Sequence, residues 1–449
     1  MEDIISLCKR RGFIYQGSDV YGGLAGTWDW GPLGVELKRR VKDLWWQFFV
    51  DHHREIYGVD AAIIMNPKVW QASGHVATSA DPLVEDLVNH RRYRADHLLK
   101  DAGISAEGLS NDEITKLIRE HNIKSPDGNE LSEVRSFNMM FKTTVGPIDT
   151  ADAVAYLRPE TAQGIFTNYR NVVDTVYPDL PFGLAQQGKA FRNEISPRDF
   201  IFRSREFEQM EIEYFVKPDE WEKHFESLLK LVHEFLEQVI GLPTDKIHEY
   251  EVPENDRAHY SRRTVDVEFD YPIGREELMG IAYRTDFDLK NIERVAKKSM
   301  EYRPKDGSDP FVPHVIEPSF GVERLVMAIL SAFYQQDEVG GSKRNVLRLP
   351  KLLAPVLVTV SPLLKNKPEL VAKAKAVYDV LNDAFPGRIN WDDSGNIGKR
   401  YRKADEIGVP SCVVVDFDSL NDDSVTVRNR DTTEQERVKI AELVNHFKD

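Results

Sequence analysis

Two neighbouring runs of strand-forming residues, 183–195 and 203–216, constrain the fold of this chain more than any other feature. The short loop between them contains Pro197, so the sequence predicts a long antiparallel hairpin. Alternate residues of a strand point to opposite faces, and one face of the second run carries Arg203, Arg205, Phe207, Gln209 and Glu211. A face with these charged residues is too polar to pack into an apolar core. It is suited to bind a nucleotide, because guanidinium groups bind phosphate through paired hydrogen bonds. An exposed hairpin face covered by salt bridges would show the same pattern.

A second segment, EPSFGVERL at residues 317–325, predicts a strand that turns into a helix. Ser319 is the predicted N-cap, and one stripe of the helix is apolar: Val322, Leu325, Val326, Ile329, Leu330 and Phe333. This geometry directs Arg324 and the helix N-terminus at a common site, which suits a bound phosphate. Taken alone, the segment also fits an ordinary capped amphipathic helix.

A third segment predicts a long helix at residues 32–55, which Gly31 and Pro32 open. Its apolar stripe is broad enough to need a packing partner, either a second copy of the chain or another part of the same chain. A strand is expected after it at residues 61–65.

The middle of the chain predicts mostly antiparallel sheet. Strand patterns dominate residues 133–320, interrupted by one helix at about 221–239. An insertion is expected at about 95–150, where Ser110 and Glu113 form a capping box for a short helix.

The predicted secondary structure changes from mostly antiparallel strands to alternating strands and helices after a polar stretch at residues 335–349. This change places a domain boundary near residue 345. Helices and strands alternate there, with strands at 354–360, 388–391, 411–417 and 424–428, and helices at about 366–384, at about 398–407 and after Thr432. The sequence therefore predicts an α+β fold with one large domain at 1–345 and a small α/β domain at 346–449.

Several classes of protein are excluded. The longest apolar stretch, residues 352–364, is too short for a membrane span, and the N-terminus lacks a secretory signal, so a cytoplasmic protein is expected. Cys8 and Cys412 are too far apart for a metal knuckle, and no Walker A or GxGxxG pattern occurs.

The net charge of −15 argues against a protein that coats nucleic acid non-specifically. Basic residues do cluster locally, at Lys343, Arg344 and Arg348 and at Lys399, Arg400, Arg402 and Lys403. These clusters are either local binding surfaces or ordinary solvated charges.

Together the three segments resemble motifs of the class II aminoacyl-tRNA synthetases. FRNEISPRDFIFRSREF at residues 191–207 is similar to motif 2, GVER at 321–324 to motif 3, and the helix that precedes Asn66 and Pro67 to motif 1. The resemblance spans nearly the entire chain. It implies an antiparallel-sheet catalytic domain that binds ATP in a bent form, and a dimer interface built by motif 1.

Longer strings resemble the homodimeric glycyl-tRNA synthetases: WDWGPLGVELK at 28–38, YRADHLL at 93–99, RPETAQG at 158–164 and FEQMEIEYF at 207–215. The tail is similar to the anticodon-binding domain that these enzymes share with the prolyl, threonyl and histidyl enzymes. Some relatives carry paired cysteines before the RADH string, whereas this chain reads VNHRRY at 88–93, so no zinc is expected.

The resemblance implies two sets of site residues. The ATP set is Arg192, Asn193, Glu194, Phe202, Arg203, Ser204, Arg205, Glu206, Phe207, Glu277, Leu278, Gly321, Val322, Glu323 and Arg324. The amino-acid set is Arg94, Glu160, Phe207, Glu208, Gln209, Met210, Glu211, Glu317, Pro318, Ser319, Phe320 and Gly321.

Individual roles follow from the same resemblance. Arg192 would hold the α-phosphate, Arg203 the γ-phosphate and Glu194 the adenine or the tRNA terminus, while Phe207 and Arg324 would stack on the two adenine faces. Glu160, Glu211 and Ser319 would bind the ammonium group of glycine and leave no space for a β-carbon. Glu277 and Glu317 would be ligands of Mg²⁺, because hard cations prefer carboxylate oxygens.

The resemblance implies glycine, ATP and tRNA(Gly) as substrates, and Lys399, Arg400 and Arg402 as contacts to the tRNA backbone. Two alternatives stay open. One is a non-catalytic relative such as the mitochondrial DNA polymerase accessory subunit, although such relatives lose the motif arginines that this chain has. The other is a synthetase of the same class for proline or threonine.

Overall fold

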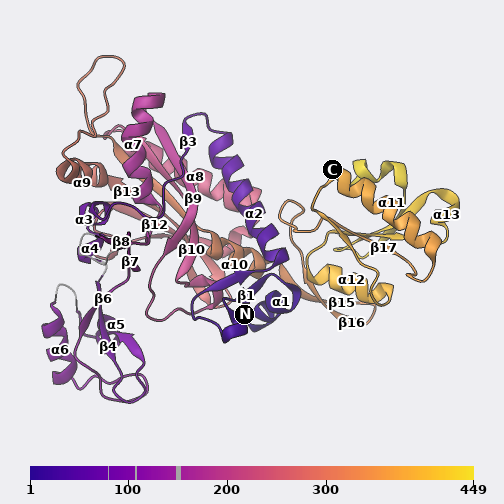
Figure 1. Cartoon of the computed structure of the whole chain (residues 1–449), viewed down its shortest axis with the longest axis horizontal. Coiled ribbons are helices and arrows are strands. Elements are labelled where there is room, and N and C mark those ends of the chain that lie inside the picture. Colours follow the sequence, from indigo (N-terminus) through magenta and orange to yellow (C-terminus); the bar gives the residue numbers. More distant parts are fainter. Residues whose placement is uncertain (79, 107–108, 148–152, 449) are drawn as a thin grey trace.

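The computed structural model describes residues 1–78, 80–106, 109–147 and 153–448. Its centre is a seven-stranded sheet with the strand order β11-β12-β13-β14-β10-β9-β3 (Figure 1). The strands are β3 (Ile56–Gly58), β9 (Phe182–Phe191), β10 (Glu206–Val216), β11 (Ile247–Glu251), β12 (Arg263–Tyr271), β13 (Gly274–Thr285) and β14 (His314–Gly321). Neighbouring strands are antiparallel, except that β3 is parallel to β9. The predicted α+β class with an antiparallel sheet is confirmed.

The hairpin predicted around Pro197 is present as β9 and β10, but both strands stop earlier at the loop end. The connection contains a short 3-10 helix, η4 (Phe200–Phe202), that the strand pattern missed. Within the sheet, Glu211 of β10 lies opposite Gln186 of β9 on one side and Ser319 of β14 on the other. The hairpin therefore brings the predicted motif residues to the middle of the sheet.

The segment after β14 differs from its prediction in one respect. Ser319 lies within β14, and α10 (Val322–Phe333) begins after Gly321, which is the N-cap. The prediction of Ser319 as N-cap was therefore wrong. Its hydroxyl donates instead to the Glu211 carboxylate across the strand pair.

The main core lies between the sheet and three helical segments. These are α2 (Pro32–Trp46) continued by the π-turn η2 (Gln47–Asp51), α8 (Trp221–Glu234) continued by η5 (Phe235–Val239), and α10. Leu37, Val41 and Trp45 of α2 are fully buried, and the Trp45 ring packs edge-on against Phe320 at 6.2 Å. The apolar stripe predicted for this helix therefore finds its partner within the same chain.

A second core, which includes Leu184 and Phe215 of the sheet, packs against α7 (Ala162–Val176) and α9 (Phe287–Ala296).

The N-terminal segment forms α1 (Glu2–Arg11), β1 (Ile14–Gln16), η1 (Asp19–Tyr21) and β2 (Trp28–Trp30). Helices α3 (Lys68–Ala72) and α4 (His75–Thr78) follow β3. The strand predicted at residues 61–65 was wrong: only Ile64 pairs, in an isolated bridge to Leu157.

A small separate unit lies at one end of the molecule (Figure 1). It consists of β4 (Ala80–Glu85), β5 (Arg92–Arg94), α5 (Ala95–Asp101), α6 (Asn111–Glu120) and β6 (Arg135–Asn138), and it has its own apolar core around Val84, Leu99 and Ile114. The predicted capping box of Ser110 and Glu113 is confirmed. A two-stranded sheet, β7 (Lys142–Thr144) and β8 (Val154–Tyr156), follows this unit.

The C-terminal unit lies at the opposite end (Figure 1). Its sheet has the order β18-β17-β19-β20-β21, with β17 (Val358–Pro362), β18 (Ile389–Trp391), β19 (Ser411–Val415), β20 (Ser424–Asn429) and β21 (Gln435–Lys439). Its helices are α11 (Pro368–Ala384), α12 (Ile397–Glu406), α13 (Ser419–Asp422) and α14 (Leu443–Lys448). The last helix predicted after Thr432 is present as α14, but the strand β21, which was not predicted, lies between Thr432 and this helix.

The polar stretch expected to separate the two domains is itself structured. It forms a hairpin of β15 (Tyr334–Val339) and β16 (Ser342–Leu347), from which Arg344 reaches Asp405 of α12 at 3.0 Å. The next residue, Glu406, pairs with Arg10 and Arg11 of α1, each at 2.5 Å. Arg344 is only 2% exposed, so it belongs to this contact and not to a basic surface. In the described part of the chain no helix is long and apolar enough to cross a membrane.

Candidate active site

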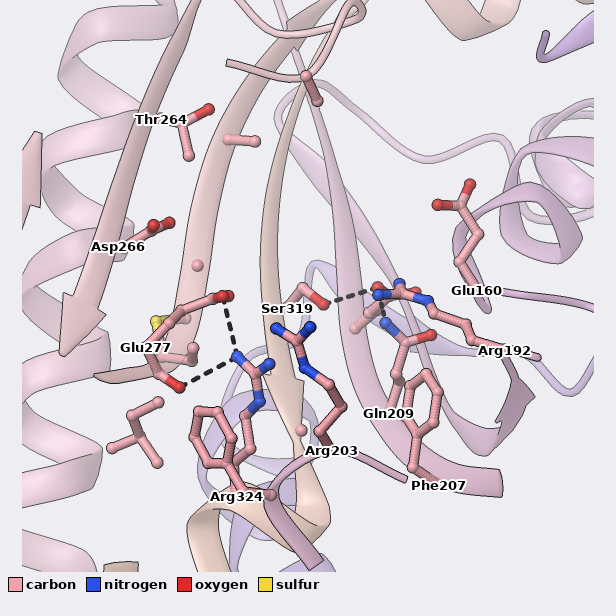
Figure 2. A pocket seen from close by; sticks show the side chains of 18 of the residues that line it. Glu160, Arg192, Arg203, Phe207, Gln209, Thr264, Asp266, Glu277, Ser319 and Arg324 are labelled. Carbon is pink, nitrogen blue, oxygen red and sulfur yellow. Dashed lines mark hydrogen bonds and ion pairs between the residues drawn. The ribbon is translucent and has the colours of Figure 1, made fainter. Parts of the chain in front are cut away.

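A cavity of about 500 Å³ lies over strands β10, β12, β13 and β14 (Figure 2). It brings together most of the residues predicted for the site: Arg94, Glu160, Arg192, Glu194, Phe202, Arg203, Ser204, Phe207, Gln209, Glu211, Glu277, Leu278, Glu317, Ser319, Gly321, Glu323 and Arg324. Because β10 alternates its side chains, Phe207, Gln209 and Glu211 point to the cavity together. The cavity has one end rich in carboxylates and another rich in arginines and aromatic rings.

Glu211 is the centre of a hydrogen-bond cluster at the carboxylate end. Ser319 Oγ donates to one carboxylate oxygen at 2.7 Å, and Gln209 Nε2 donates to the same oxygen at 3.0 Å. The Thr161 hydroxyl donates to the other oxygen. These donors fix the orientation of the Glu211 carboxylate even when no ligand is bound.

Glu160, in the loop before α7, faces the same end of the cavity (Figure 2). Its carboxylate accepts a hydrogen bond from Gln163 Nε2 at 3.2 Å and lies 3.4 Å from His75 Nε2. Burial acts to raise the pKa of Glu160, but His75, Arg284 and Gln163 outweigh it and hold the pKa well below its ordinary value. Glu160 is therefore a buried anion at neutral pH.

Glu317 is held from behind by Arg284, a residue that the sequence did not point to. Arg284 is 1% exposed, donates to Glu317 at 2.7 Å and binds Asp288 of α9 with two further hydrogen bonds of 2.8 and 2.9 Å. Burial raises the pKa of Glu317 to about 8 against the opposing effect of Arg284. The pKa of Glu213 is also raised, mainly by burial and secondly by the nearby Glu317. Glu213 is fully buried and lies on the same face of β10 as Glu211. This end of the cavity therefore retains a carboxyl proton at neutral pH.

The raised pKa of Glu317 makes the stability of the protein depend on pH. Its folded-state pKa lies near 8 and its ordinary value is 4.5, so the folded chain holds this proton more tightly than the unfolded chain. The resulting stabilisation is complete below the ordinary value and is lost as the pH rises through the folded value. We expect the thermal midpoint of the ligand-free protein to fall across this window in scanning calorimetry, and the fall to be smaller in Glu317→Gln. An equal fall in both proteins would contradict the assignment.

Arg192 and Arg203 project into the middle of the cavity, between Glu160 on one side and Arg324 on the other (Figure 2). The Arg192 guanidinium lies 5.3 Å from the centre of the Phe207 ring, and its Nε donates to the Pro159 carbonyl at 3.1 Å. Among the described residues Arg203 makes no side-chain hydrogen bond or ion pair, so its guanidinium is available to a ligand. Two arginines in this arrangement suit an anionic ligand such as a polyphosphate.

Arg324, near the start of α10, lies over the Phe202 ring at 4.4 Å. Its Nη1 donates to the Glu277 carboxylate at 2.9 Å. Asp266 of β12 lies on the same wall, and burial together with Glu277 raises its pKa to about 7. This wall therefore presents the planar guanidinium of Arg324 and the carboxyl groups of Glu277 and Asp266 to a bound ligand.

Eight predicted residues do not line the cavity: Asn193, Arg205, Glu206, Glu208, Met210, Pro318, Phe320 and Val322. Met210, Phe320 and Val322 are fully buried in the core on the other face of the sheet. Arg205 was predicted to share a face with Phe207, but β10 begins only at Glu206 and alternation does not extend back to it. Its guanidinium bonds the carbonyls of Glu194 and Ala25 and so braces the loop.

The cavity also includes residues that the sequence reasoning missed: Met139, Ile201, Val252, Asp256, Arg257, Ala258, Tyr260, Thr264, Asp266, Met279, Gly280 and Ala282. Thr264 and Asp266 lie on β12, where polar residues alternate with the buried Val265, Val267 and Phe269. This alternation is a signal in the sequence that could have found them. The loop around Tyr260, whose ring lies 3.7 Å from the Arg284 guanidinium, carried no comparable pattern.

The two carboxylates predicted to bind Mg²⁺ lie too far apart to share an ion. Glu317 is opposite Ala282 in the sheet, five residues along β13 from Glu277, which corresponds to about 17 Å of strand. Both carboxylates are paired with an arginine, Glu317 with Arg284 and Glu277 with Arg324, but the Glu277 side chain is 45% exposed, whereas that of Glu317 is 8% exposed. Within the described ranges no group of three or more His, Cys, Asp or Glu side chains converges on a possible metal position. Glu277 is the carboxylate that suits an ion accompanying phosphates.

The basic residues of α12 do not act alike. Arg400 is 3% exposed and donates to the carbonyls of Pro362, Asp393, Ser394 and Gly395, so it holds the loop before its own helix. Lys399 is exposed. Of the three residues predicted to contact tRNA, Arg400 is therefore structural.

The antiparallel sheet, the arginine-lined cavity and the separate α/β unit agree with two known families. The family model of the tRNA synthetase class II core domain (G, H, P, S and T) matches residues 141–333, and that of the anticodon binding domain matches residues 357–449. Fold and site thus define a class II aminoacyl-tRNA synthetase. Glycine–tRNA ligases of Deinococcus radiodurans, Caldanaerobacter subterraneus and Macrococcus caseolyticus are 46%, 44% and 45% identical to it, over 99%, 100% and 99% of this chain and 97%, 98% and 97% of theirs. The chain belongs to the glycine–tRNA ligases.

Proposed function

We propose that this chain activates glycine with ATP to glycyl-adenylate and pyrophosphate, and then transfers glycine to the 3′ end of tRNA(Gly). The observation that carries the proposal is a single cavity with buried carboxylates at one end and arginines beside aromatic rings at the other. An ammonium group suits the first end and a nucleotide suits the second, so the two reactants meet between them. Pyrophosphate exchange measured with glycine, proline and threonine tests this proposal. Exchange with glycine alone is expected, and exchange with proline or threonine would reassign the substrate.

The enzyme has to select glycine by excluding larger amino acids, because the hydrogen side chain of glycine offers no group to bind. Glu160, Glu211 and Ser319 would bind the ammonium group, with Gln209 and Arg94 completing the shell. The rigid cluster around Glu211 supports this role, since donors already fix its orientation at 2.7 and 3.0 Å. A side chain on the substrate would have to displace these packed groups.

In the activation step a carboxylate oxygen of glycine attacks the α-phosphorus of ATP in line. The new bond is between that oxygen and phosphorus, and the bond to the pyrophosphate oxygen breaks, so pyrophosphate leaves with the electron pair. Arg192 would stabilise the negative charge that develops on the α-phosphate oxygens, and Arg203 would bind the γ-phosphate. Phe207 and Arg324 would hold the two faces of adenine. Positioning and electrostatics account for this step without a covalent enzyme intermediate.

Mg²⁺ bound with ATP would neutralise part of the phosphate charge, and Glu277 is the residue that would hold it. In the transfer step the terminal ribose hydroxyl of tRNA attacks the carbonyl carbon of the adenylate, and AMP leaves. The alternative of a non-catalytic relative is disfavoured by the presence of Arg192, Arg203 and Arg324 in one cavity.

The division into a catalytic domain at residues 1–345 and an anticodon-binding domain at 346–449 is part of the proposal. An apolar core that lies wholly within the second range, around Val358, Val377 and Val413, supports it, although Ala404 and Ile407 pack into the main core across the proposed boundary. A homodimer in the cytoplasm is proposed from the family resemblance. The stripe of α2 does not support a dimer, because Leu37, Val41 and Trp45 are covered within the chain.

Among the basic residues of the C-terminal unit, exposed Lys399 is the proposed phosphate contact. We expect Lys399→Ala to weaken tRNA(Gly) binding at all salt concentrations and to reduce the slope of log affinity against log salt by about 1. Filter binding across a salt series measures both quantities. Lys375→Ala, a change of an exposed lysine on α11, serves as the matched control. An unaltered slope in Lys399→Ala would remove Lys399 from the interface.

A further inference from the structure

Beside the cavity, which its Glu323 also lines, a cluster of two lysines and two glutamates joins three elements of the fold. It consists of Lys38 and Lys42 of α2, Glu208 of β10 and Glu323 of α10, and we refer to it as the rear charge cluster. Lys38 Nζ lies 2.5 Å from one Glu208 oxygen and 3.6 Å from a Glu323 oxygen, while Lys42 Nζ lies 2.6 Å from the second Glu208 oxygen. The cluster contains equal numbers of positive and negative charges.

The two glutamates are sequence neighbours of the proposed adenine-binding residues. Glu208 directly follows Phe207, and because strand residues alternate, its side chain points away from the cavity towards α2. Glu323 directly precedes Arg324 in the first turn of α10. The Glu208 backbone N–H also donates to Glu323 at 2.8 Å, so strand and helix are bonded at this point. The distance between the Phe207 and Arg324 backbones therefore depends on the rear charge cluster.

The two lysines do not contribute equally. Lys38 contacts both glutamates, whereas Lys42 contacts only Glu208. The Lys38 side chain is 13% exposed and those of its partners 10% and 7%, so water screens these charges poorly. Removing Lys38 would leave Glu323 as a buried carboxylate without a cation, while removing Lys42 would leave both glutamates paired.

We propose that Lys38 is a positioning residue for ATP: by bridging Glu208 and Glu323 from behind the sheet, it fixes the slot between Phe207 and Arg324 that receives adenine. This inference rests on the proposed function, because it assumes that adenine binds between these two residues. Lys38 never touches the nucleotide. It acts through the backbone of β10 and through the first turn of α10.

Lys38→Met keeps the length of the side chain and removes the bridge, and Lys42→Met is the matched control from the next turn of the same helix. In pyrophosphate exchange we expect Lys38→Met to raise KM for ATP about tenfold and to leave KM for glycine within about twofold of the wild type. Lys42→Met should leave both constants within about twofold. Lys38→Arg, which restores a cation, should recover most of the loss. A general loss of structure would raise both constants together, and the expected split between them would not appear.

ATP binding measured by calorimetry gives a readout independent of turnover, and thermal melts show that each variant is folded at the assay temperature. Should Lys38→Met not fold, Lys38→Gln decides the question. It removes the cation and leaves Glu323, which itself lines the cavity, unchanged, so a selective rise in KM for ATP is again expected. If the folded variants bind ATP as the wild type does, the inference is overturned. A wild type without exchange activity would overturn the proposed function instead, so the two failures are distinguishable.

Discussion

Arg192→Ala should reduce glycine-dependent pyrophosphate exchange by roughly 10²- to 10³-fold or more, the range seen when one donor to a developing oxyanion is removed. Arg192 lies between the carboxylate end and the nucleotide end of the cavity, with its guanidinium 5.3 Å from the Phe207 ring (Figure 2). Its charge would be needed most when the α-phosphorus has five oxygen neighbours. The loss is therefore expected in kcat, with a smaller change in KM for ATP.

Arg198→Ala is the matched control, because Arg198 belongs to the same loop but its side chain is 68% exposed and, among the residues that the structure describes, pairs only with Asp199. Its exchange rate should be close to that of the wild type. Near-normal exchange by Arg192→Ala would mean that the charge on the α-phosphate is stabilised elsewhere, and the assignment would fail.

Glu160→Gln should raise KM for glycine by roughly 10- to 100-fold, which corresponds to the loss of one hydrogen bond to a charged group. Glu160 is an anion at neutral pH because its pKa is held well below the ordinary value, so glutamine changes its charge and little of its shape. KM for ATP should stay near the wild-type value, since Glu160 lies at the other end of the cavity from Arg324 (Figure 2).

Glu206→Gln provides the control for this second prediction. Glu206 does not line the cavity and pairs with Lys189 in a neighbouring strand, so its loss should leave KM for glycine unchanged. Equal effects of the two substitutions, or a rise in KM for ATP in Glu160→Gln, would show that Glu160 does not bind the ammonium group. The initial rates of exchange at varied glycine and varied ATP give both constants.

The parts of the site that were predictable from the sequence are those governed by local periodicity. Strand alternation correctly placed Phe207, Gln209 and Glu211 on one face, because all three lie inside β10. The same rule failed for Arg205, which lies before the strand begins. Ser319 was assigned to the wrong element because a serine before a helical stripe looks like an N-cap whether or not a strand continues through it.

Contacts between distant segments were not predictable in this way. Arg284 comes from β13, Asp288 from α9 and Glu317 from β14, and only the folded sheet brings them together. Arg400 was predicted as a surface cation, but its guanidinium donates four hydrogen bonds to backbone carbonyls, three in the loop before α12 and one at the end of β17. Edge strand β21 was missed because only one of its five residues, Val438, is buried, which leaves almost no apolar pattern to read.

The small unit of β4 to β6 has a consequence for how such enzymes vary. Its first and last strands are paired, with Ala80 opposite Asn138, so the chain leaves the catalytic domain and returns to it at nearly the same point. Its apolar residues pack on one another in a core separate from that of the sheet. A segment of this kind can be lengthened, shortened or exchanged at little entropic cost to the rest of the protein, because closing the gap requires only a short loop. Strand β5 is the exception, because its Arg94 lines the cavity and the reaction centre depends on its being retained.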